Sequence, residues 1–315
     1  MRLAILSRNK NLHSIRRLLE EARRMRVECA VIDPLECQLV VDGKKSGIYV
    51  GPKALPRFDA ILPRIGASIT DYGLAVVKQF EALGMYTVNG SASIAQSRDK
   101  MRSLQILTHA GLRVPRSVLT RTPRGLKQSV ERVGGLPVVM KLLRGTQGVG
   151  VMLVSVPVTA GSVFDTLQDL EQDVIIQQFI AEGGGRDYRV FVIGEKVVGT
   201  MMRTAPSGEF RSNLHRGGEG SIIKLPKTYE RAAIRAAKTL GVEVAGVDII
   251  ESKSGPLILE VNSSPGFEGI EAATGLNIAG MIVKYVSARA RRMNKGKTKR
   301  KPVAQRAQRV RSTKR

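Results

Sequence analysis

Two apolar stretches near residue 250 constrain the fold of this chain more than any other feature. Residues 244–250 and 256–261 have the length and apolar character of buried strands, and residues 252–255 between them have the composition of a turn. The sequence therefore predicts a β-hairpin. Asp248 lies in the first stretch and Glu260 near the end of the second, so the hairpin should carry both carboxylates.

Asn262 follows Glu260 by two residues, so these two side chains should share one face of the second strand. Three hard oxygen ligands on rigid strands suit Mg²⁺, which takes few protein carboxylates and completes its octahedron with water and phosphate oxygens. Asp248, Glu260 and Asn262 are therefore the candidate metal ligands. The alternative is that the acids pair with some of the 51 Lys and Arg residues, although a surface ion pair does not require acids at the ends of apolar strands.

A glycine-rich loop at residues 145–150 separates two further apolar stretches at 138–142 and 151–154. Because a strand lies on each side, this loop is neither a Walker A loop nor a Rossmann fingerprint. It can fold backbone N–H groups over phosphates like a lid, or it can be a plain hairpin turn. The lid candidates are Thr146, Gln147, Gly148 and Gly150. Lys141 precedes them at a strand end, where an ammonium group needs an anion, either a nucleotide phosphate or a carboxylate.

A polar, basic segment at residues 209–218 is expected to be a loop, with Arg203 shortly before it on a strand. Arg211 offers a planar fork for phosphate or carboxylate, and Asn213 offers an amide that can orient phosphate oxygens or a metal-bound water. The alternative is a solvated surface loop. Asp187 is a candidate acceptor for ribose hydroxyl groups, or else a solvated loop residue.

The order of strand and helix patterns predicts several structural units. Residues 1–95 should form a small α/β domain with a parallel sheet, although residues 43–51 look irregular. Residues 96–180 open on a helix at 97–110 and hold the glycine-rich loop, and residues 181–290 hold the acidic hairpin.

The net charge of +24 is concentrated at the C-terminus. Thirteen Lys or Arg residues and no acid lie between Arg289 and Arg315, which leaves +11 for the first 288 residues. Residues 291–315 are poor in apolar residues and are predicted to be a disordered basic tail. A polycation of this kind is expected to contact RNA through phosphates.

The composition argues against a membrane-spanning protein, a secreted protein and a zinc-binding protein. No stretch approaches the roughly 18 apolar residues that span a bilayer, and the first residues are charged too early for a signal peptide, so we expect a cytoplasmic protein without membrane contact. Cys29 and Cys37 are the only cysteines and have no histidine at metal-binding spacing, so they should be ordinary thiols.

Taken together, these features resemble the ATP-grasp superfamily over about residues 1–290. The motifs in chain order are Arg98-Asp99-Lys100, Lys141 before the glycine loop, Gln178-Phe179 at a strand end, and Asp248 with Glu260-Val261-Asn262. Within the superfamily, five strings are similar to those of the RimK family: Pro63-Arg-Ile-Gly66, Gly145-Thr-Gln-Gly148, Phe210-Arg-Ser-Asn-Leu-His-Arg-Gly-Gly218, Val244-Ala-Gly-Val-Asp248 and Glu260-Val-Asn-Ser-Ser-Pro-Gly266. The resemblance implies an α/β and α+β chain with an ATP-grasp fold and an N-terminal Rossmann-like pre-ATP-grasp domain.

The resemblance also implies a role for each motif residue. Gln178 and Phe179 would contact the adenine between two subdomains. Lys100 and Lys141 would contact the phosphates, and Asp187 would contact the ribose. The nucleotide and its transferring end would be contacted by Arg211, Ser212 and Asn213. Arg203 and Arg211 would be catalytic, and Asp248, Glu260 and Asn262 would hold two Mg²⁺ or Mn²⁺ ions. Arg64 follows a strand of the first domain, at the sheet edge where open α/β sheets bind ligands, and is expected to bind a substrate carboxylate.

Members of the RimK family add L-glutamate to the C-terminus of a small-subunit ribosomal protein. The resemblance implies the same acceptor here, with ATP consumed through an acyl phosphate, growth of a poly-α-glutamate chain, and assembly as a homo-oligomer. One alternative is a ligase that joins small glutamyl peptides. Another is an RNA-binding or ribosome-associated module in which the basic tail carries the function and the ATP site is vestigial.

Overall fold

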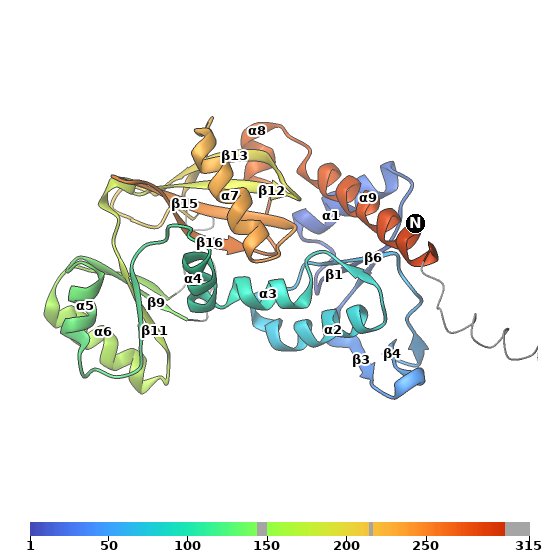
Figure 1. The fold of residues 1–315 in the computed structure, drawn as a ribbon, viewed down its shortest axis with the longest axis horizontal. Helices are drawn as coiled ribbons and strands as arrows, with labels where there is room; N and C mark the ends of the chain where they lie inside the picture. The colour runs from blue at the N-terminus through green and yellow to red at the C-terminus, as the bar shows by residue number, and fades with distance from the viewer. Residues whose placement is uncertain (144–149, 214–216, 300–315) are drawn as a thin grey trace, which may run out of the picture.

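The computed structural model of the protein describes residues 1–143, 150–213 and 217–299, with side chains up to Lys295. The predictions for Thr146, Gln147, Gly148 and residues 300–315 lie outside the described residues. The described chain forms a parallel sheet at one end, an antiparallel sheet at the other, and a five-stranded sheet between them (Figure 1). In this part of the chain, every helix is too short or too polar to cross a membrane.

The N-terminal sheet is parallel, as the sequence predicted. Its order is β2-β1-β6-β7, with the parallel pairs β1–β2, β1–β6 and β6–β7. The strands are β1 (Arg2–Leu6), β2 (Glu28–Ile32), β6 (Ala60–Pro63) and β7 (Tyr86–Thr87), and the helices are α1 (His13–Arg24) and α2 (Thr70–Ala82). Ile15, Leu18 and Ala22 form the apolar stripe that α1 buries against this sheet.

Residues 43–51 are more regular than expected. Gly43–Lys45 form a short 3₁₀ helix, and residues 47–50 form the central strand of a small antiparallel sheet of β3 (Cys37–Val40), β4 (Gly47–Val50) and β5 (Lys53–Ala54). The prediction of an irregular segment was wrong because glycines and lysines flank a strand of only four residues. Ile48 nevertheless packs into the core beneath α2, and this tertiary contact outweighs weak local propensity.

The single helix expected over residues 97–110 is two helices, α3 (Ser91–Arg98) and α4 (Lys100–His109). Asp99 interrupts them with extended backbone angles, and its Oδ1 accepts a hydrogen bond of 2.9 Å from Arg102 N. Asp99 is therefore the N-cap of α4. The break places Lys100 in the first turn of α4.

Two antiparallel sheets follow. The first, of order β10-β9-β11-β8, contains β8 (Ser117–Thr120), β9 (Val138–Leu142), β10 (Val151–Val154) and β11 (Val174–Gln178), with α5 (Leu126–Val133) and α6 (Pro157–Asp169) on one face. The second, of order β14-β13-β12-β15-β16, contains β12 (Arg186–Ile193), β13 (Lys196–Thr204), β14 (Glu219–Ile222), β15 (Val244–Ser252) and β16 (Gly255–Asn262), packed against α7 (Lys227–Thr239). The predicted hairpin is confirmed as β15–β16, in which Asp248 and Glu260 are direct cross-strand neighbours.

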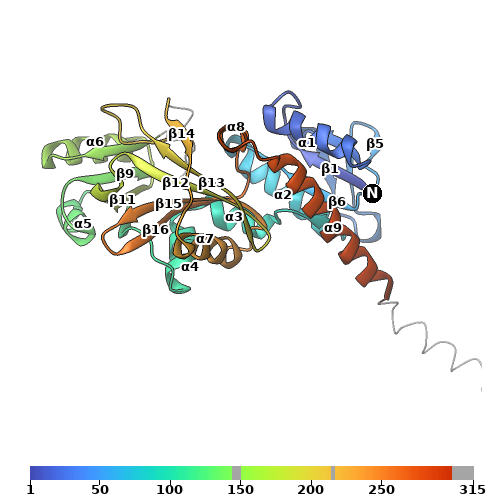
Figure 2. The ribbon, with the colours of Figure 1, turned by 90° about the horizontal axis from the view of Figure 1, so that it is seen from above.

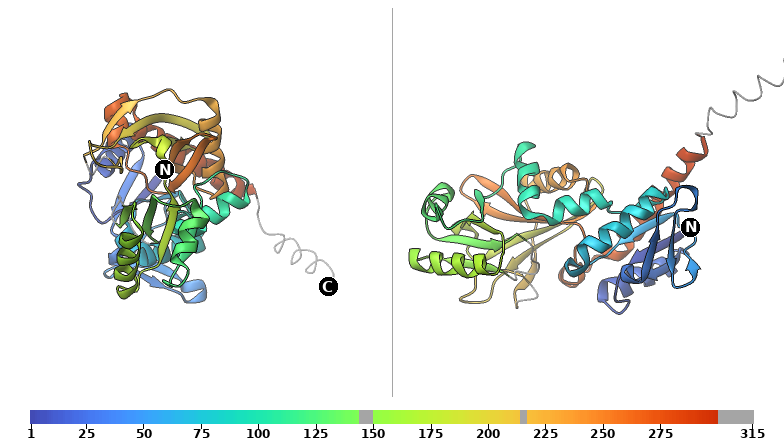
Figure 3. Two further views of the ribbon diagram at one scale, coloured as in Figure 1. Left: turned by 90° about the vertical axis from the view of Figure 1, so that its left-hand side faces the viewer. Right: turned by 90° about the horizontal axis from the view of Figure 1, so that it is seen from below.

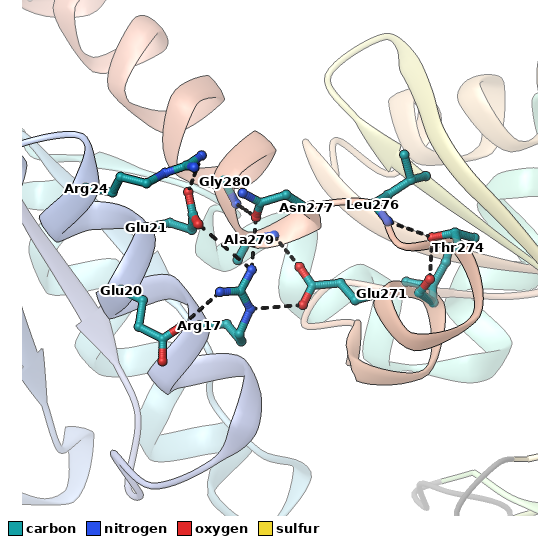
Figure 4. A network of polar contacts seen from close by, with 11 residues as sticks. Arg17, Glu20, Glu21, Arg24, Glu271, Thr274, Leu276, Asn277, Ala279 and Gly280 are labelled. Carbon is teal, nitrogen blue, oxygen red and sulfur yellow. Dashed lines mark hydrogen bonds and ion pairs between the residues drawn. The ribbon is translucent and has the colours of Figure 1, made fainter.

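Helix α8 (Glu268–Thr274) packs on β13 and β14, and α9 (Ile278–Lys299) returns to the N-terminal domain, where it lies along α1 and β6 (Figures 2 and 3). Ile278, Ile282 and Val286 of α9 share a core with residues of β1 and α1. A polar network reinforces this contact, because Arg17 donates 3.2 Å hydrogen bonds to both Glu271 and Asn277 (Figure 4). The helix continues to Lys299, so the prediction of disorder from residue 291 was wrong for residues 291–299; Ala290 is buried, and Asn294 donates a 2.8 Å bond to Asp59.

A single asparagine joins the first domain to the five-stranded sheet. The buried Asn89 amide donates to Ser263 O at 2.7 Å and to Val244 O at 2.9 Å. Its Oδ1 accepts from Glu243 N at 2.7 Å and from Val244 N at 3.0 Å. One side chain therefore satisfies four backbone groups, three at the start of β15 and one directly after the end of β16.

We predict that Asn89→Ala destabilises the protein by about 2–4 kcal/mol, because buried backbone donors and acceptors lose their partner. Urea unfolding followed by circular dichroism measures the change. Asn11→Ala, at an exposed position of the same domain, is the matched control and should change the free energy of unfolding by less than about 0.5 kcal/mol. Equal stability of the two variants would contradict the junction role.

Candidate active site

A row of buried charges crosses the five-stranded sheet. Asp187 on β12 faces Arg203 on β13, and Arg189 on β12 faces Asp248 on β15, each pair directly in register. Arg203 donates two 2.6 Å hydrogen bonds to Asp187 and also contacts Asp248 at 3.0 Å. Arg189 binds both oxygens of Asp248. The row therefore alternates in sign, as Asp187, Arg203, Asp248 and Arg189.

This arrangement keeps Asp248 ionised although only 2% of the residue is exposed. Burial alone would raise the pKa of its carboxyl group, but Arg189 and Arg203 outweigh that effect and bring the pKa down to about 2. For Arg203 the signs are reversed. Burial lowers the pKa of its guanidinium group, but Asp248 and Asp187 raise the pKa by more, so the net shift is upward. Gly246 makes room for this packing, because a Cβ there would lie 3.2 Å from Arg189 Cδ.

Glu260 and Asn262 extend the acidic side of the site along β16. Asn262 Nδ2 donates a 2.9 Å hydrogen bond to Glu260 Oε1, which leaves the Asn262 amide oxygen facing away from that carboxylate. Asp248 and Glu260 are neighbours across β15 and β16. Two carboxylates and one amide oxygen thus gather at the end of one hairpin.

Two lysines from other elements oppose these acids. Lys100 comes from the first turn of α4 and Lys141 from β9. Burial lowers the pKa of both ammonium groups, and the carboxylate of Glu260 offsets part of that effect in each. A pair of partly desolvated cations close to one another and to an acid is a setting that an additional anion would stabilise.

Gln177 holds Lys141 in place. Lys141 Nζ donates a 2.6 Å hydrogen bond to Gln177 Oε1, and Gln177 Nε2 in turn donates to Ser117 Oγ at 2.9 Å. Gln177 is 3% exposed. The buried amide therefore fixes the direction of the ammonium group without neutralising it.

The segment between β13 and β14 belongs to the five-stranded sheet and makes a hydrogen bond to β10 of the other antiparallel sheet. Arg211 donates to both carboxylate oxygens of Glu209, and these bonds are the main cause of a Glu209 pKa near 2. Arg211 Nη1 also donates a 3.2 Å hydrogen bond to Val151 O, at the start of the strand that follows the glycine-rich loop. Ser212 is buried and Asn213 half-buried beside it.

Gln178 and Phe179 lie where the chain passes from one antiparallel sheet to the other, between β11 and β12. Gln178 N donates a 2.8 Å hydrogen bond to Arg116 O, and its side chain accepts one of 3.3 Å from Arg116 Nε. Gly150, the described residue of the predicted lid, has φ +69°, and a Cβ there would meet Leu142 Cδ1 at 2.5 Å. This position therefore requires glycine.

Arg64 lies at the carboxyl end of β6, where the first domain meets the segment after β16. Its Nη2 donates a 2.7 Å hydrogen bond to Pro265 O, and its guanidinium lies 5.7 Å from the centre of the Phe267 ring. Burial lowers the pKa of Arg64 to about 10. Arg64 therefore faces the chain that continues directly from Asn262.

Two residues of this arrangement, Arg189 and Gln177, were not predicted. Arg189 follows Asp187 by two positions on a strand, so the period-two rule already placed the two on one face. Gln177 is a polar residue at the end of the apolar run 174–176, which is the same signal that identified Lys141. Asp187 and Arg203, predicted as separate contacts, are partners of each other.

The donor set fits a hard divalent ion. Asp248 is ionised, its Oδ1 keeps a lone pair beyond the hydrogen bond from Arg189 whereas Oδ2 contacts both arginines, and Glu260 and Asn262 add two further oxygen donors. Within the described residues there is no group of three or more His, Cys, Asp or Glu side chains that could hold a metal by itself. An ion at this hairpin would therefore take Asn262 together with water or substrate oxygens.

Comparison with protein families agrees with this geometry. Residues 1–94 match the RimK PreATP-grasp domain, and residues 97–286 match the RimK-like ATP-grasp domain. The chain belongs to the RimK family of ATP-grasp ligases. It is accordingly an ATP-dependent ligase.

Similar proteins cover nearly the whole RimK-like chain. "Probable alpha-L-glutamate ligase 1" of Shewanella amazonensis is 46% identical over 295 residues, which is 94% of this chain and 98% of that protein. "Probable alpha-L-glutamate ligase 2" of Shewanella baltica is 48% identical over the same length and the same shares.

Solved structures support the fold. The ATP-grasp ligase PsnB complexed with its minimal precursor has a TM-score of 0.71 at 22% identity, covering 91% of this chain and 98% of that one. D-alanine–D-alanine ligase from Bacillus anthracis complexed with ATP has a TM-score of 0.70 at 18% identity, covering 94% and 99%. The expected ATP-grasp fold with an N-terminal pre-ATP-grasp domain is therefore confirmed.

We predict that Asp248→Asn and Glu260→Gln differ in stability although both abolish turnover. Asp248→Asn leaves two buried arginines without their shared counter-charge and should cost about 3–5 kcal/mol. Glu260→Gln keeps a half-buried polar group of the same shape and should cost less than about 1 kcal/mol. Urea unfolding without nucleotide measures both values, and an equal loss in the two variants would show that the ionic row does not stabilise the sheet.

Proposed function

We propose that this protein joins L-glutamate to the C-terminal carboxylate of a small-subunit ribosomal protein, with ATP converted to ADP and phosphate through an acyl phosphate. The observation that carries the proposal is the opposition of the cations Lys100 and Lys141 to the oxygen donors Asp248, Glu260 and Asn262. Such a site would neutralise triphosphate from two sides, with the lysine ammonium groups on one and, on the other, the metal ions that the oxygen donors would hold. The names of the relatives, α-L-glutamate ligases, support glutamate as the amine.

In this proposal the cationic residues bind the phosphates and the oxygen donors hold the metal ions. Lys100, Lys141 and Arg211 stabilise the negative charge of the phosphates as the acceptor carboxylate attacks the γ-phosphorus and ADP departs. Asp248, Glu260 and Asn262 would hold two Mg²⁺ or Mn²⁺ ions, which supply further charge neutralisation for the transferring phosphoryl group. The glutamate amine then attacks the acyl carbon, an amide bond forms, and inorganic phosphate leaves.

Arg203 acts through its neighbours in this scheme. It is 4% exposed, and its guanidinium is bonded to Asp187 and Asp248, so it orients the metal-binding carboxylate. Asp187 would reach the ribose through lone pairs that Arg203 does not use. Gln178 and Phe179 would line the adenine at the passage between the two sheets, and Ser212 and Asn213 would contact the transferring end.

The glycine-rich segment belongs to the same proposal. Thr146, Gln147, Gly148 and Gly150 would donate backbone N–H groups to the phosphates. Val151 directly follows this segment, and its carbonyl oxygen accepts a hydrogen bond from Arg211. This bond links residues 209–213 to the strand that carries the glycine-rich segment.

Arg64 is the proposed substrate-binding residue. It lies between the carboxyl ends of β1 and β6, where the chain has gone first to β2 and then back past β1, so this edge is a topological switch point. Of its guanidinium nitrogens, Nη2 is committed to Pro265 O, and the remaining donors suit a carboxylate. Both proposed substrates are anionic, which matches the charge of +11 on the first 288 residues.

Further parts of the proposal concern the setting: a cytoplasmic location, extension to poly-α-glutamate, and a homo-oligomer. A ligase for small glutamyl peptides is the second candidate, because the same site would serve it. A vestigial site is disfavoured, since a protein that had lost ATP turnover would have no physical need for a buried, fully paired ionic row.

We predict that purified protein with ATP and Mg²⁺ forms ADP and phosphate only when glutamate, or glutamate with an acceptor, is present. An acyl phosphate forms only with a carboxylate substrate, and γ-phosphoryl transfer leaves ADP. Chromatography of nucleotides and mass spectrometry of added ribosomal proteins measure the outcome. Formation of AMP and pyrophosphate would overturn the acyl-phosphate route, and modification of glutamyl peptides alone would favour the second candidate.

We predict that Arg64→Ala raises the KM for the carboxylate substrate by about tenfold or more and leaves the Kd for ATP within about twofold, since one charged hydrogen-bonding partner is worth about 1.5–3 kcal/mol. Arg64→Lys should recover part of the loss. Arg57→Ala, which removes an exposed arginine of the same domain, is the control. A lowered melting temperature with unchanged KM would instead assign Arg64 to the bond with Pro265 alone.

A further inference from the structure

The outer face of α9 carries four cations, with Ala288 between the first and the second of them. Lys284, Ala288, Arg291, Arg292 and Lys295 are exposed and recur at i, i+4, i+7, i+8 and i+11, the spacing of one helical face. From Lys284 to Lys295 this face extends about 16 Å along the helix axis. We call these five residues the α9 basic face.

No acid interrupts this face within α9. The 22 residues of the helix include seven Lys or Arg and no Asp or Glu, and residues 300–315 add seven more cations without an acid. Two acids that bond to the middle and the far end of α9 are already engaged. Glu243 accepts hydrogen bonds from Tyr86, Tyr285 and Arg289, and Asp59 accepts from Arg2 N and Asn294.

These contacts also hold the helix in place as a rigid support. The opposite face of α9 is buried, with Ile282, Val286 and Ala290 at 1% exposure or less. Asn294 is bonded to Asp59 one residue before β6, so the far end of α9 lies at the amino-end edge of the parallel sheet. Arg64 lies at the carboxyl-end edge, and Figure 2 shows α9 leaving the molecule at the end opposite α5 and α6. A large ligand on this face would leave the active site open.

We propose that the α9 basic face binds the phosphate backbone of RNA. A row of cations without aromatic neighbours on its exposed side suits phosphates rather than bases. An anionic membrane fits less well, because a helix that lies in a bilayer turns its apolar face outward, and here that face is in the core. The phosphate contact is independent of the proposed ligation; only the choice of RNA over DNA rests on the proposed ribosomal acceptor.

The test compares two triple charge reversals that alter the net charge equally. Arg291→Glu/Arg292→Glu/Lys295→Glu changes the α9 basic face and keeps the anchors Arg289 and Asn294. Lys44→Glu/Lys45→Glu/Lys53→Glu changes exposed lysines around the small β3–β5 sheet and serves as the control. Binding of a labelled RNA hairpin to each full-length protein is measured by fluorescence anisotropy at several salt concentrations, after equal melting temperatures have shown that both variants fold.

The α9 variant should lose about tenfold or more in RNA affinity, and its dependence of log K on log salt should become shallower by roughly two to three units. The control should bind within about threefold of the wild type with the same slope. Equal affinity and slope for the two variants would overturn the proposal. The proposal would also be overturned if the wild type bound a DNA duplex more tightly than RNA. The same holds if the α9 variant kept its RNA affinity and lost binding only to vesicles of phosphatidylserine and phosphatidylcholine in equal parts.

Glutamate ligation to free acceptor protein separates this inference from the proposed function. The α9 variant should keep the wild-type ligation rate within about twofold, since no residue of the basic face belongs to the active site. If the wild type ligates no glutamate but binds RNA through α9, the proposed function fails and the RNA-binding surface stands. If ligation occurs and the α9 variant binds RNA as tightly as the control, the proposed function stands and the RNA-binding surface fails.

Discussion

The candidate active site of this protein depends on the ion pairs that Asp248 makes with Arg189 and Arg203. An isolated carboxylate at 2% exposure would protonate or be excluded from the sheet, so the site exists only because two arginines on neighbouring strands supply its counter-charge. The same arginines fix the direction of the carboxylate before any substrate arrives. Preorganised charge of this kind is the main means by which ligases stabilise phosphoryl transfer, and the surrounding β-ladder holds it without reorganisation.

Much of the fold followed from local sequence, and the limits of that reasoning are physical. The β15–β16 hairpin and the parallel strands were predictable because apolar periodicity and turn composition are local signals. The pairing of Arg189 with Asp248 was not, since it depends on the register between strands 59 residues apart. The β3–β5 sheet and the helix through residues 291–299 were missed for a related reason, because packing against Ile48 and Ala290 decides a conformation that weak local propensity leaves open.

The proposed substrate and metal sites meet along one short segment, residues 262–267. Asn262 begins it, Pro265 accepts the hydrogen bond of Arg64, and Phe267 packs beneath the guanidinium. Asn89 holds the neighbouring Ser263 to the first domain. The proposed carboxylate-binding residue of the first domain and the proposed metal ligand Asn262 are therefore connected through one short stretch of backbone, so a displacement of the first domain would be transmitted to Asn262.

The packing of α9 against β1 and α1 links the two ends of the chain. Leu3, Ile5 and Ile15 share their core with Ile278, Ile282 and Val286, so a strand of the first domain is buried by a helix that is synthesised after both antiparallel sheets. During synthesis the N-terminal sheet emerges early but has one apolar face uncovered until about residue 290 has been released. Closing a contact over such a separation is slow compared with local pairing, and the nascent chain exposes that face throughout translation of the ATP-grasp sheets. Folding of the first domain is therefore completed only after α9 has been synthesised, and chaperones that bind apolar surfaces have the longest access to β1 and α1.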